Sequence, residues 1–274
     1  MDSLFYFLDP AFWNSPKLVS YFIATLFVIV LLRYLITAMV YRHGVLALLR
    51  KQPIPNDQPV LRKQFYREIG WSTLSSVIFA VLAAGCYAAY QRGWTMVYTK
   101  LDQYPLWYFV FSIVLILFLY ETYYYWLHRW MHKPGVFRIV HKVHHQSVHT
   151  SVFTSFSFHP IEALLQFLFI PLIIVILPVH YLALGTVLLL MTISAVINHA
   201  GVEVFSPKIR THPLGRWLIG ATHHDLHHKE FRRNYGLYFT FWDRWMNTES
   251  EKYNDAFIRN ATKETSQGKI NQSR

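Results

Sequence analysis

The sequence predicts an all-α protein that crosses a membrane several times, and three observations lead to this fold class. The 274 residues are 53% hydrophobic and only 15% charged, which is too apolar for an average soluble domain. Long apolar segments alternate with polar, basic segments. Histidines number 15, and most of them lie in polar segments of the second half. The expected architecture is a polytopic helical bundle of about four to five spans, or two helical hairpins, with a histidine-rich helical cap on its cytoplasmic side.

Positive charge is distributed as in a membrane protein rather than as in a nucleic-acid-binding protein. The net charge is +11. Of the 26 Lys and Arg residues, six lie in residues 41–67, four in 128–160 and twelve in 199–274. The cytoplasmic loops of membrane proteins carry such an excess of Lys and Arg. We therefore assign these three regions to the cytoplasmic side and expect no nucleic-acid partner.

Five apolar segments are candidates for membrane spans at a rise of about 1.5 Å per residue. They are residues 18–41, 68–90, 106–127, 161–178 and 180–198. Arg33 interrupts the first segment, and its side chain either reaches the interface or faces protein. The last two segments are joined so tightly that they form an antiparallel hairpin, whether spanning or re-entrant. This order predicts an outside N-terminus, and it brings the histidine-rich segments to one membrane face.

Eight histidines form three boxes at helical spacing. The boxes contain His128 and His132, then His141, His144 and His145, and finally His224, His227 and His228. Residues three and four apart share one face of a helix, so each box presents its imidazoles to a common point. Three such boxes predict a metal site without thiolate ligands, because the only cysteine, Cys86, lies in an apolar segment.

The number of imidazoles implies two metal ions. A tetrahedral zinc ion takes four protein ligands and a catalytic one takes three, so eight exceed the needs of one ion. Imidazole suits iron, copper, zinc and nickel, and the spacing therefore leaves the metal open. There is no HExxH sequence, since His128 is followed by Arg129, Trp130, Met131 and His132, and a zincin-type protease would lack its general base.

The boxes HRWMH, HKVHH and HDLHH carry a resemblance to a known family. Together with FTSFSFHPIEALLQ and NYGLYFTFWDRWMNT, they resemble the fatty acid hydroxylase and sterol desaturase superfamily of integral-membrane di-iron oxygenases. The pattern is most similar to the sterol C5-desaturase and C4-methyl oxidase branch. The resemblance implies an oxidoreductase that uses O2 to hydroxylate or desaturate a C–H bond of a sterol-like or fatty-acyl lipid in lipid biosynthesis.

The resemblance also implies the site residues. The metal ligands would be the eight box histidines together with His159 and His199, and no catalytic residue is implied beyond these ligands. Metal-bound histidines commonly donate their second ring N–H to a carboxylate. Glu121 lies seven residues before His128, on nearly the same helical face, and is expected to accept such a bond. The other acids expected to do so are Glu203, Asp225 and Asp243.

The implied cofactors are two iron ions, cycling between Fe2+ and Fe3+, with O2 as co-substrate. Two external electrons are needed per turnover, and the sequence contains no heme-binding HPGG, no GxGxxG and no cysteine cluster. The resemblance therefore implies a separate donor, cytochrome b5 or a ferredoxin with its reductase. The lipid substrate is expected to arrive from the bilayer of a bacterial inner membrane or of the endoplasmic reticulum.

The resemblance covers residues 105–248 and divides the chain into three parts. Residues 1–104 would form an N-terminal membrane region with two spans and a basic cytoplasmic loop. Residues 105–248 would form the fatty acid hydroxylase/sterol desaturase-like catalytic domain. Residues 249–274 have few large apolar side chains and are expected to form a polar, flexible tail.

Two other classes of function are weighed against this one. A non-catalytic membrane protein that binds or transports metal would carry ionisable groups along a path through its spans. Arg33 is the only charged residue that lies deep in a predicted span. A zinc-dependent membrane hydrolase would need fewer ligands and a general base. The histidine pattern therefore favours the di-iron enzyme over both alternatives.

Overall fold

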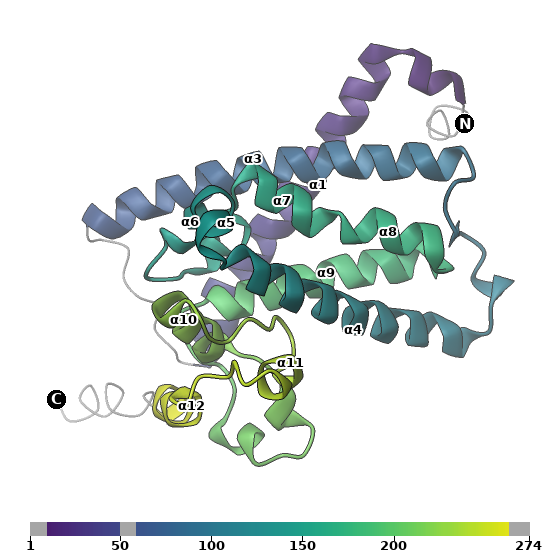
Figure 1. Ribbon diagram of the computed structural model, residues 1–274. Coiled ribbons are helices and arrows are strands. Elements are labelled where there is room, and N and C mark those ends of the chain that lie inside the picture. The colour runs from purple at the N-terminus through teal and green to yellow at the C-terminus, as the bar shows by residue number, and fades with distance from the viewer. Residues whose placement is uncertain (1–9, 50–58, 263–274) are drawn as a thin grey trace.

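The computed structural model describes residues 10–49 and 59–262 and confirms the all-α class (Figure 1). The long helices are α1 (Pro16–Met39), α3 (Pro59–Gln91), α4 (Leu106–Met131) and α9 (Tyr181–His199). The shorter helices are α2 (Leu46–Leu48), α5 (Pro134–Ile139), α6 (Lys142–His145), α7 (Pro160–Phe167), α8 (Phe169–Ile176), α10 (Ala221–Glu230), α11 (Phe241–Trp245) and α12 (Tyr253–Thr262). Among the described residues the only strands are β1 (Val97–Tyr98) and β2 (Val179–His180), which pair in parallel with Val97 opposite Val179.

Four helical segments are long and apolar enough to cross a membrane, which agrees with the lower predicted number of spans. They are Pro16–Leu48, Leu61–Gln91, Leu106–Met131 and Tyr181–His199. The fifth expected span is a shorter apolar segment, Pro160–Ile176, divided into α7 and α8 at Leu168. Pro171 has no backbone N–H to donate to Phe167, which accounts for the interruption. At about 25 Å, this segment is shorter than the hydrocarbon core of about 30 Å.

The basic loop expected over residues 41–67 is shorter than predicted. Helix α1 continues through a π-helical turn, Val40–Val45, into α2, even though this turn contains the polar residues Arg42 and His43. Helix α3 already begins at Pro59, nine residues before the predicted span. Residues 50–58, in the middle of the expected loop, lie outside the described residues.

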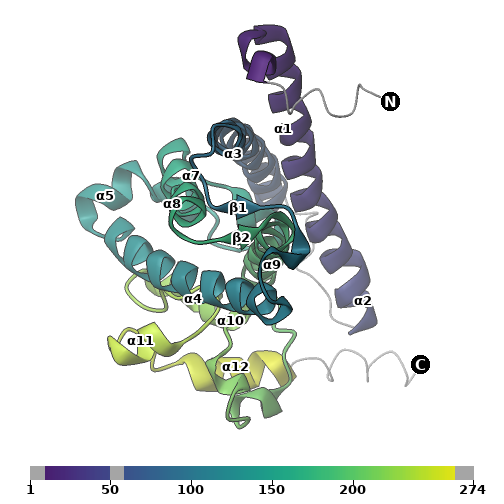
Figure 2. The ribbon, with the colours of Figure 1, turned by 90° about the vertical axis from the view of Figure 1, so that its right-hand side faces the viewer.

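Two apolar cores lie among the long helices of the described bundle. Helices α4, α8 and α9 enclose the first core, which contains the buried residues Ile116, Ile173 and Val187. Helix α1 packs against α3 and α9 around the second core. There Tyr34 is fully buried, stacks on Phe156 and donates its hydroxyl hydrogen to the Phe153 carbonyl oxygen at 2.9 Å. Figure 2 shows α1 along the outer side of this bundle.

The described part of the C-terminal tail corrects the expectation of a flexible segment. Residues Tyr253–Thr262 form α12, and the remaining residues, 263–274, lie outside the described part of the chain. Tyr253 and Phe257 lie on one helical face and are almost fully buried against Leu226 of α10. The Arg210 guanidinium lies 4.4 Å above the Tyr253 ring. Helix α12 therefore supports the helix that carries the third histidine box.

Candidate metal centre

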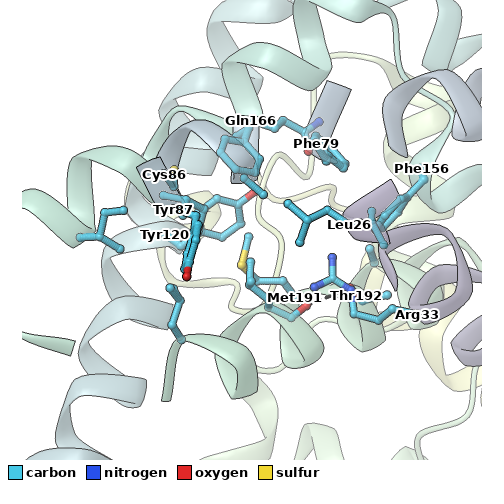
Figure 3. Close-up of a pocket in the computed structure, with 18 of the residues that line it drawn as sticks. Leu26, Arg33, Phe79, Cys86, Tyr87, Tyr120, Phe156, Gln166, Met191 and Thr192 are labelled. Atoms are coloured by element: carbon cyan, nitrogen blue, oxygen red, sulfur yellow. Dashed lines mark hydrogen bonds between the residues drawn. The ribbon is translucent and has the colours of Figure 1, made fainter. Parts of the chain in front are cut away.

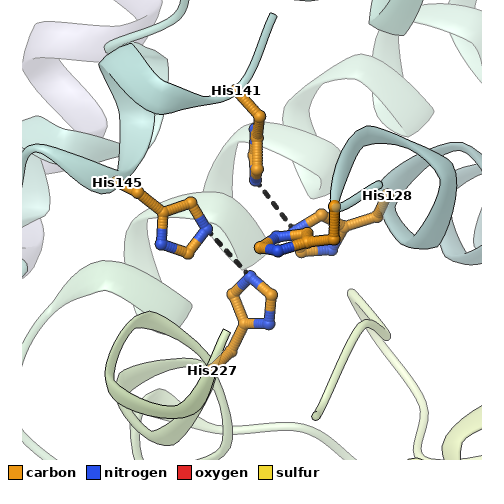
Figure 4. Close-up of side chains that lie close together, drawn as sticks. His128, His141, His145 and His227 are labelled. Atoms are coloured by element: carbon orange, nitrogen blue, oxygen red, sulfur yellow. Dashed lines mark hydrogen bonds between the residues drawn. The ribbon is translucent and has the colours of Figure 1, made fainter. Parts of the chain in front are cut away.

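Nine histidines converge in two groups at one end of the bundle. The first histidine group contains His128, His132, His141, His145 and His227, and the second contains His144, His199, His224 and His228. Within each group, one ring nitrogen of every histidine lies within 4.8 Å of the others. Figure 4 shows four rings of the first group directed at a common point. The structure thus brings together all eight box histidines and His199.

The two HxxHH boxes are divided between the groups. In the second box, His141 and His145 join the first group, whereas His144 joins the second. In the third box the division is reversed, because His227 joins the first group while its two neighbours in the box join the second. Residues four apart lie about 40° apart around a helix, whereas the residue between them is displaced sideways. Each box therefore contacts both groups and holds them together.

Two connections, after α4 and between α9 and α10, bring the boxes together. Helix α4 ends at Met131, immediately before His132, and Pro134 starts α5 from the turn that follows. Helix α9 ends at His199. Helix α10 then begins after Gly220, where a β-carbon would approach the Glu203 carboxylate to within 2.6 Å. A larger residue at this position would have to displace the Glu203 carboxylate, so Gly220 suits the close packing at the start of α10.

In the first group, hydrogen bonds at the outer ring nitrogens orient the inner ones. His128 Nδ1 lies 2.9 Å from the Tyr235 carbonyl oxygen, which can only accept, so this nitrogen carries the hydrogen. His141 Nδ1 lies 2.8 Å from Glu162 Oε1, an oxygen that also accepts from the Gln166 amide. Both Nε2 atoms therefore have lone pairs, yet they face each other at 3.1 Å. Two acceptors at this distance repel unless a cation binds them both.

The second group repeats this arrangement. His144 Nδ1 and His199 Nδ1 donate to the carbonyl oxygens of Ser157 and Ala195, at 3.3 and 2.7 Å. Their Nε2 atoms, which then have only lone pairs, lie 3.1 Å apart. His224 Nε2 lies 2.9 Å from His199 Nε2, and His228 Nε2 lies 3.1 Å from His224 Nε2. In each group, the rings whose Nδ1 contacts an acceptor oxygen thus direct their Nε2 lone pairs at one another.

These separations fit a metal ion in each group. Imidazole nitrogens bind such ions at about 2.1 Å. Two nitrogens at right angles around one ion would then be about 3.0 Å apart, and two on opposite sides about 4.2 Å apart. The observed separations of 2.9 to 3.1 Å between neighbouring Nε2 atoms match the right-angle value. The donor set, entirely imidazole, suits iron, copper, zinc or nickel.

Burial keeps the histidines outside the apolar helices neutral. Burial, together with the charge of the neighbouring His128, lowers the pKa of His132 to about 2. The same two causes, burial first and neighbouring imidazoles second, hold the pKa of the other box histidines outside those helices well below its ordinary value. These are His141, His144, His145, His224, His227 and His228. Neutral imidazole is the form that binds metal.

The metal-free protein is expected to lose stability in mild acid. The unfolded chain protonates these histidines near pH 6.5, whereas the folded chain does not, so it binds fewer protons. The stability is therefore complete above about pH 6.5 and falls as the pH drops, by up to about 1.4 kcal/mol per pH unit for each such histidine. Thermal unfolding of the chelator-treated protein in detergent, measured from about pH 8 to pH 5.5, tests this. A constant midpoint over that range would contradict it.

Contrary to the prediction, Glu121 does not form a hydrogen bond with a histidine of either group. It is fully buried and accepts hydrogen bonds from the backbone N–H groups of Leu237 and Tyr238, at 3.1 and 2.6 Å. Although it lies on nearly the same face of α4 as His128, the loop after α10 is closer to it than the ring is. Glu121 therefore anchors this loop to α4.

Glu203 and Asp225 also differ from their predicted roles. Glu203 accepts from the backbone N–H groups of Phe205 and Thr222, at 3.1 and 3.0 Å, and so stabilises the start of α10. Asp225 points away from the histidines and forms an ion pair with Lys229 one turn later. The carboxylate of Asp225 cannot also reach the inner face of α10, because its neighbours in the box occupy that face.

Asp243 acts on the histidines through a loop. It accepts hydrogen bonds from the N–H groups of Tyr235 and Gly236, at 2.9 and 2.8 Å, and from the Thr248 hydroxyl at 2.7 Å. The Tyr235 carbonyl in turn accepts from His128. His223 Nε2 lies 3.4 Å from Asp243. Burial alone would raise the pKa of Asp243, but the interaction with His223 and the hydrogen bonds from Thr248 and Gly236 outweigh burial and lower it.

Glu162 is the acid that contacts a predicted ligand, and sequence reasoning missed it. It is fully buried on α7, and Oε1 lies 2.8 Å from His141 Nδ1. A carboxylate in the apolar segment IEALLQF was the available signal, because such a group needs a buried partner. His159, three residues earlier, lies in neither group. Its Nδ1 accepts from the Ile161 N–H at the start of α7, which accounts for its position.

Replacing Glu162 with glutamine is expected to weaken metal binding in the first group. The variant loses the carboxyl group that orients His141, and loss of such a partner typically lowers metal affinity by about 10- to 100-fold. Chelator competition with the purified protein measures the change. Asp225→Asn is the matched control, since Asp225 pairs with Lys229 and belongs to neither histidine group. Equal affinities for wild type and Glu162→Gln, or an equal loss in the control, would contradict the assigned role.

An apolar cavity of about 560 Å³ lies beside the histidines (Figure 3). Helix α9 lines it along its whole length, from Tyr181 to His199, which corresponds to about 27 Å at the helical rise. Tyr124, whose ring lies 5.1 Å from that of His128, also borders the cavity. The cavity thus extends from the ends of α3 and α8 to a histidine of the second group.

Four helices apolar enough to cross a membrane, two groups of converging histidines and an adjoining apolar cavity define a membrane protein with two candidate metal sites. Residues 113–248 match the family model described as fatty acid hydroxylase, within the predicted range of 105–248. This part of the chain therefore belongs to the fatty acid hydroxylase family, and the predicted resemblance is confirmed.

Several similar proteins have names that refer to the oxidation or desaturation of sterols. The chain is 31% identical to human lathosterol oxidase over 186 residues, which cover 67% of this chain and 60% of the relative. It is 28% identical to the mouse lathosterol oxidase over 248 residues, covering 87% of this chain and 78% of the relative. It is 28% identical to a Delta(7)-sterol 5(6)-desaturase of Gibberella zeae over 185 residues, covering 68% and 56%. No solved structure gives a significant match.

Proposed function

We propose that the chain is a membrane-bound, di-iron, O2-dependent oxidoreductase that hydroxylates or desaturates a C–H bond of a sterol-like or fatty-acyl lipid. The observation that carries this proposal is the contact between the apolar cavity and the second histidine group, since His199 belongs to both. A lipid in the cavity would lie next to the metal centre. The names of the relatives, lathosterol oxidase and sterol desaturase, support the same class of reaction.

The first histidine group would hold one iron ion and the second group the other. The tautomers support this assignment, because the outer nitrogens donate to oxygen atoms and the inner lone pairs stay available. When bound, the iron pair supplies the activation of O2 that an unactivated C–H bond requires. His159 is not included in this ligand set, because its ring accepts a backbone hydrogen bond elsewhere.

The side chains around the metal centre would orient the ligands and exclude water. Glu162 and the carbonyl oxygens of Tyr235 and Ser157 hold three ligand rings in one tautomer. Eight of the nine histidines are almost fully buried, and His132 is the exception. Buried ligands and an apolar cavity limit water at the reacting carbon, which favours attack on the lipid over side reactions.

The proposal includes an external electron donor, cytochrome b5 or a ferredoxin with its reductase, and a site that faces the cytoplasm. The distribution of Lys and Arg supports this orientation, since twelve of the 26 lie in residues 199–274. The apolar helices support insertion into a bilayer, either a bacterial inner membrane or that of the endoplasmic reticulum. Labelling of single introduced cysteines at exposed positions 149 and 232 tests the orientation. Reagent access from the outer side at either position would contradict it.

Comparison of lipid extracts tests the proposed reaction. Cells that produce the protein should contain a lipid that has gained one oxygen or lost two hydrogens relative to cells without it. Cells with the Glu162→Gln variant should contain less of this product. An unchanged lipid profile, with the iron-loaded protein and a reductant present, would contradict the proposal.

A further inference from the structure

Arg33 is the only charged residue, by formal charge at neutral pH, among the described residues that line the cavity. The other lining residues are apolar, aromatic or neutral, and they include no acid. Figure 3 shows the Arg33 guanidinium within the group of side chains around the cavity, together with Leu26, Met191 and Thr192. A guanidinium in such surroundings needs a specific explanation.

The Arg33 guanidinium has no hydrogen-bond or ion-pair partner among the described residues. Its Nε is buried and makes no hydrogen bond, and no described carboxylate forms an ion pair with it. An unpaired charge in apolar surroundings is costly, which is why charged residues in membrane spans pair with other groups or serve function. The position is also well defined, since Tyr34, the next residue, is fixed by its bond to the Phe153 carbonyl.

We propose that Arg33 binds the anionic head group of a single-chain lipid, a carboxylate or a phosphate, whose tail occupies the cavity. This inference rests on the proposed function only in treating the cavity as the lipid site. A guanidinium donates two parallel hydrogen bonds to such an anion and neutralises its charge. A neutral hydroxyl would accept one hydrogen bond but leave the charge uncompensated. The cavity wall, about 27 Å long along α9, accommodates an extended chain.

Competitive binding to the wild-type protein tests the head-group preference. The full chain is purified in a neutral detergent, and radiolabelled hexadecanoate is displaced by hexadecyl phosphate, by hexadecanol or by cholesterol. The two anions are expected to bind at least about tenfold more tightly than hexadecanol. Equal affinities for hexadecanoate and hexadecanol, or tighter binding of cholesterol than of both, would overturn the proposal. The difference between carboxylate and phosphate identifies the head group.

Variants at Arg33 test whether this residue causes the preference for anionic head groups. Arg33→Met should lower the affinity for hexadecanoate by at least about tenfold and change the affinity for hexadecanol by less than about threefold. Arg33→Lys should retain part of the preference. Arg62→Met is the matched control, because Arg62 is an exposed arginine of α3 outside the cavity. A loss in the control, or an equal loss for both ligands in Arg33→Met, would overturn the proposal.

Binding and oxidation are read separately, so the two proposals fail separately. If the protein oxidises lipids but binds anions no better than alcohols, the Arg33 inference fails and the proposed function remains. If the anion preference depends on Arg33 but no lipid is oxidised by the iron-loaded protein, the Arg33 inference is supported and the proposed function fails.

Discussion

Replacing His144 or His227 by alanine is expected to abolish lipid oxidation and to lower the bound metal from two ions per chain toward one. Each histidine belongs to a different group, and each donates its Nδ1 hydrogen to a backbone carbonyl so that Nε2 can bind metal. The loss of lipid-oxidation activity should exceed the roughly 100-fold effect of removing a partner that only orients a ligand. Metal analysis of the purified variants, with lipid oxidation assayed in parallel, measures both effects.

His149→Ala is the control for this experiment, because the exposed His149 ring belongs to neither group. It should keep both metal ions and full activity. Both ligand variants should still insert into the membrane, since the apolar helices are unchanged. Activity within about threefold of wild type in both variants would contradict the assignment of these histidines as ligands.

Replacing Asp243 by asparagine is expected to lower the free energy of unfolding by about 3 kcal/mol. The carboxylate accepts three hydrogen bonds, from Tyr235, Gly236 and Thr248, and an amide has only one oxygen to offer them. One N–H group of the loop would then lose its buried acceptor. Because the Tyr235 carbonyl orients His128, metal affinity in the first group should fall as well. Thermal unfolding of the metal-free protein separates the stability effect from the metal effect.

Asp255→Asn serves as the comparison, since Asp255 is an exposed acid of α12. Its unfolding midpoint should match that of wild type. The low pKa of Asp243 also sets the sign of the pH effect. Its contribution is present above the ordinary pKa of 3.8 and is lost as the pH falls through the lower folded value. A wild-type midpoint in Asp243→Asn would show that the loop does not depend on this carboxylate.

The fold class and most of the histidine set could be predicted because both follow from local spacing. An apolar segment of sufficient length predicts a membrane helix, and i, i+3, i+4 spacing predicts a shared face. His199 has no partner at such spacing, and only the family resemblance indicated it. The division of each HxxHH box between two groups depends on how α6 and α10 face each other, which spacing within one box does not determine.

The acids were harder to predict because their partners are distant in sequence. Glu121 shares a helical face with His128, but a loop 116 residues away supplies closer donors. Glu162 contacts a histidine 21 residues earlier, through packing between α7 and the α5–α6 turn. Helix α12 was missed for a similar reason, since its few apolar residues lie on one face and only the contact with Leu226 makes them a core.

The most direct test of the account is the metal content of the active protein. The purified chain should bind two iron ions per chain and oxidise a lipid only when iron, O2 and a reductant are present. A single zinc ion per chain, with activity that does not require iron, would contradict the account and favour a hydrolase.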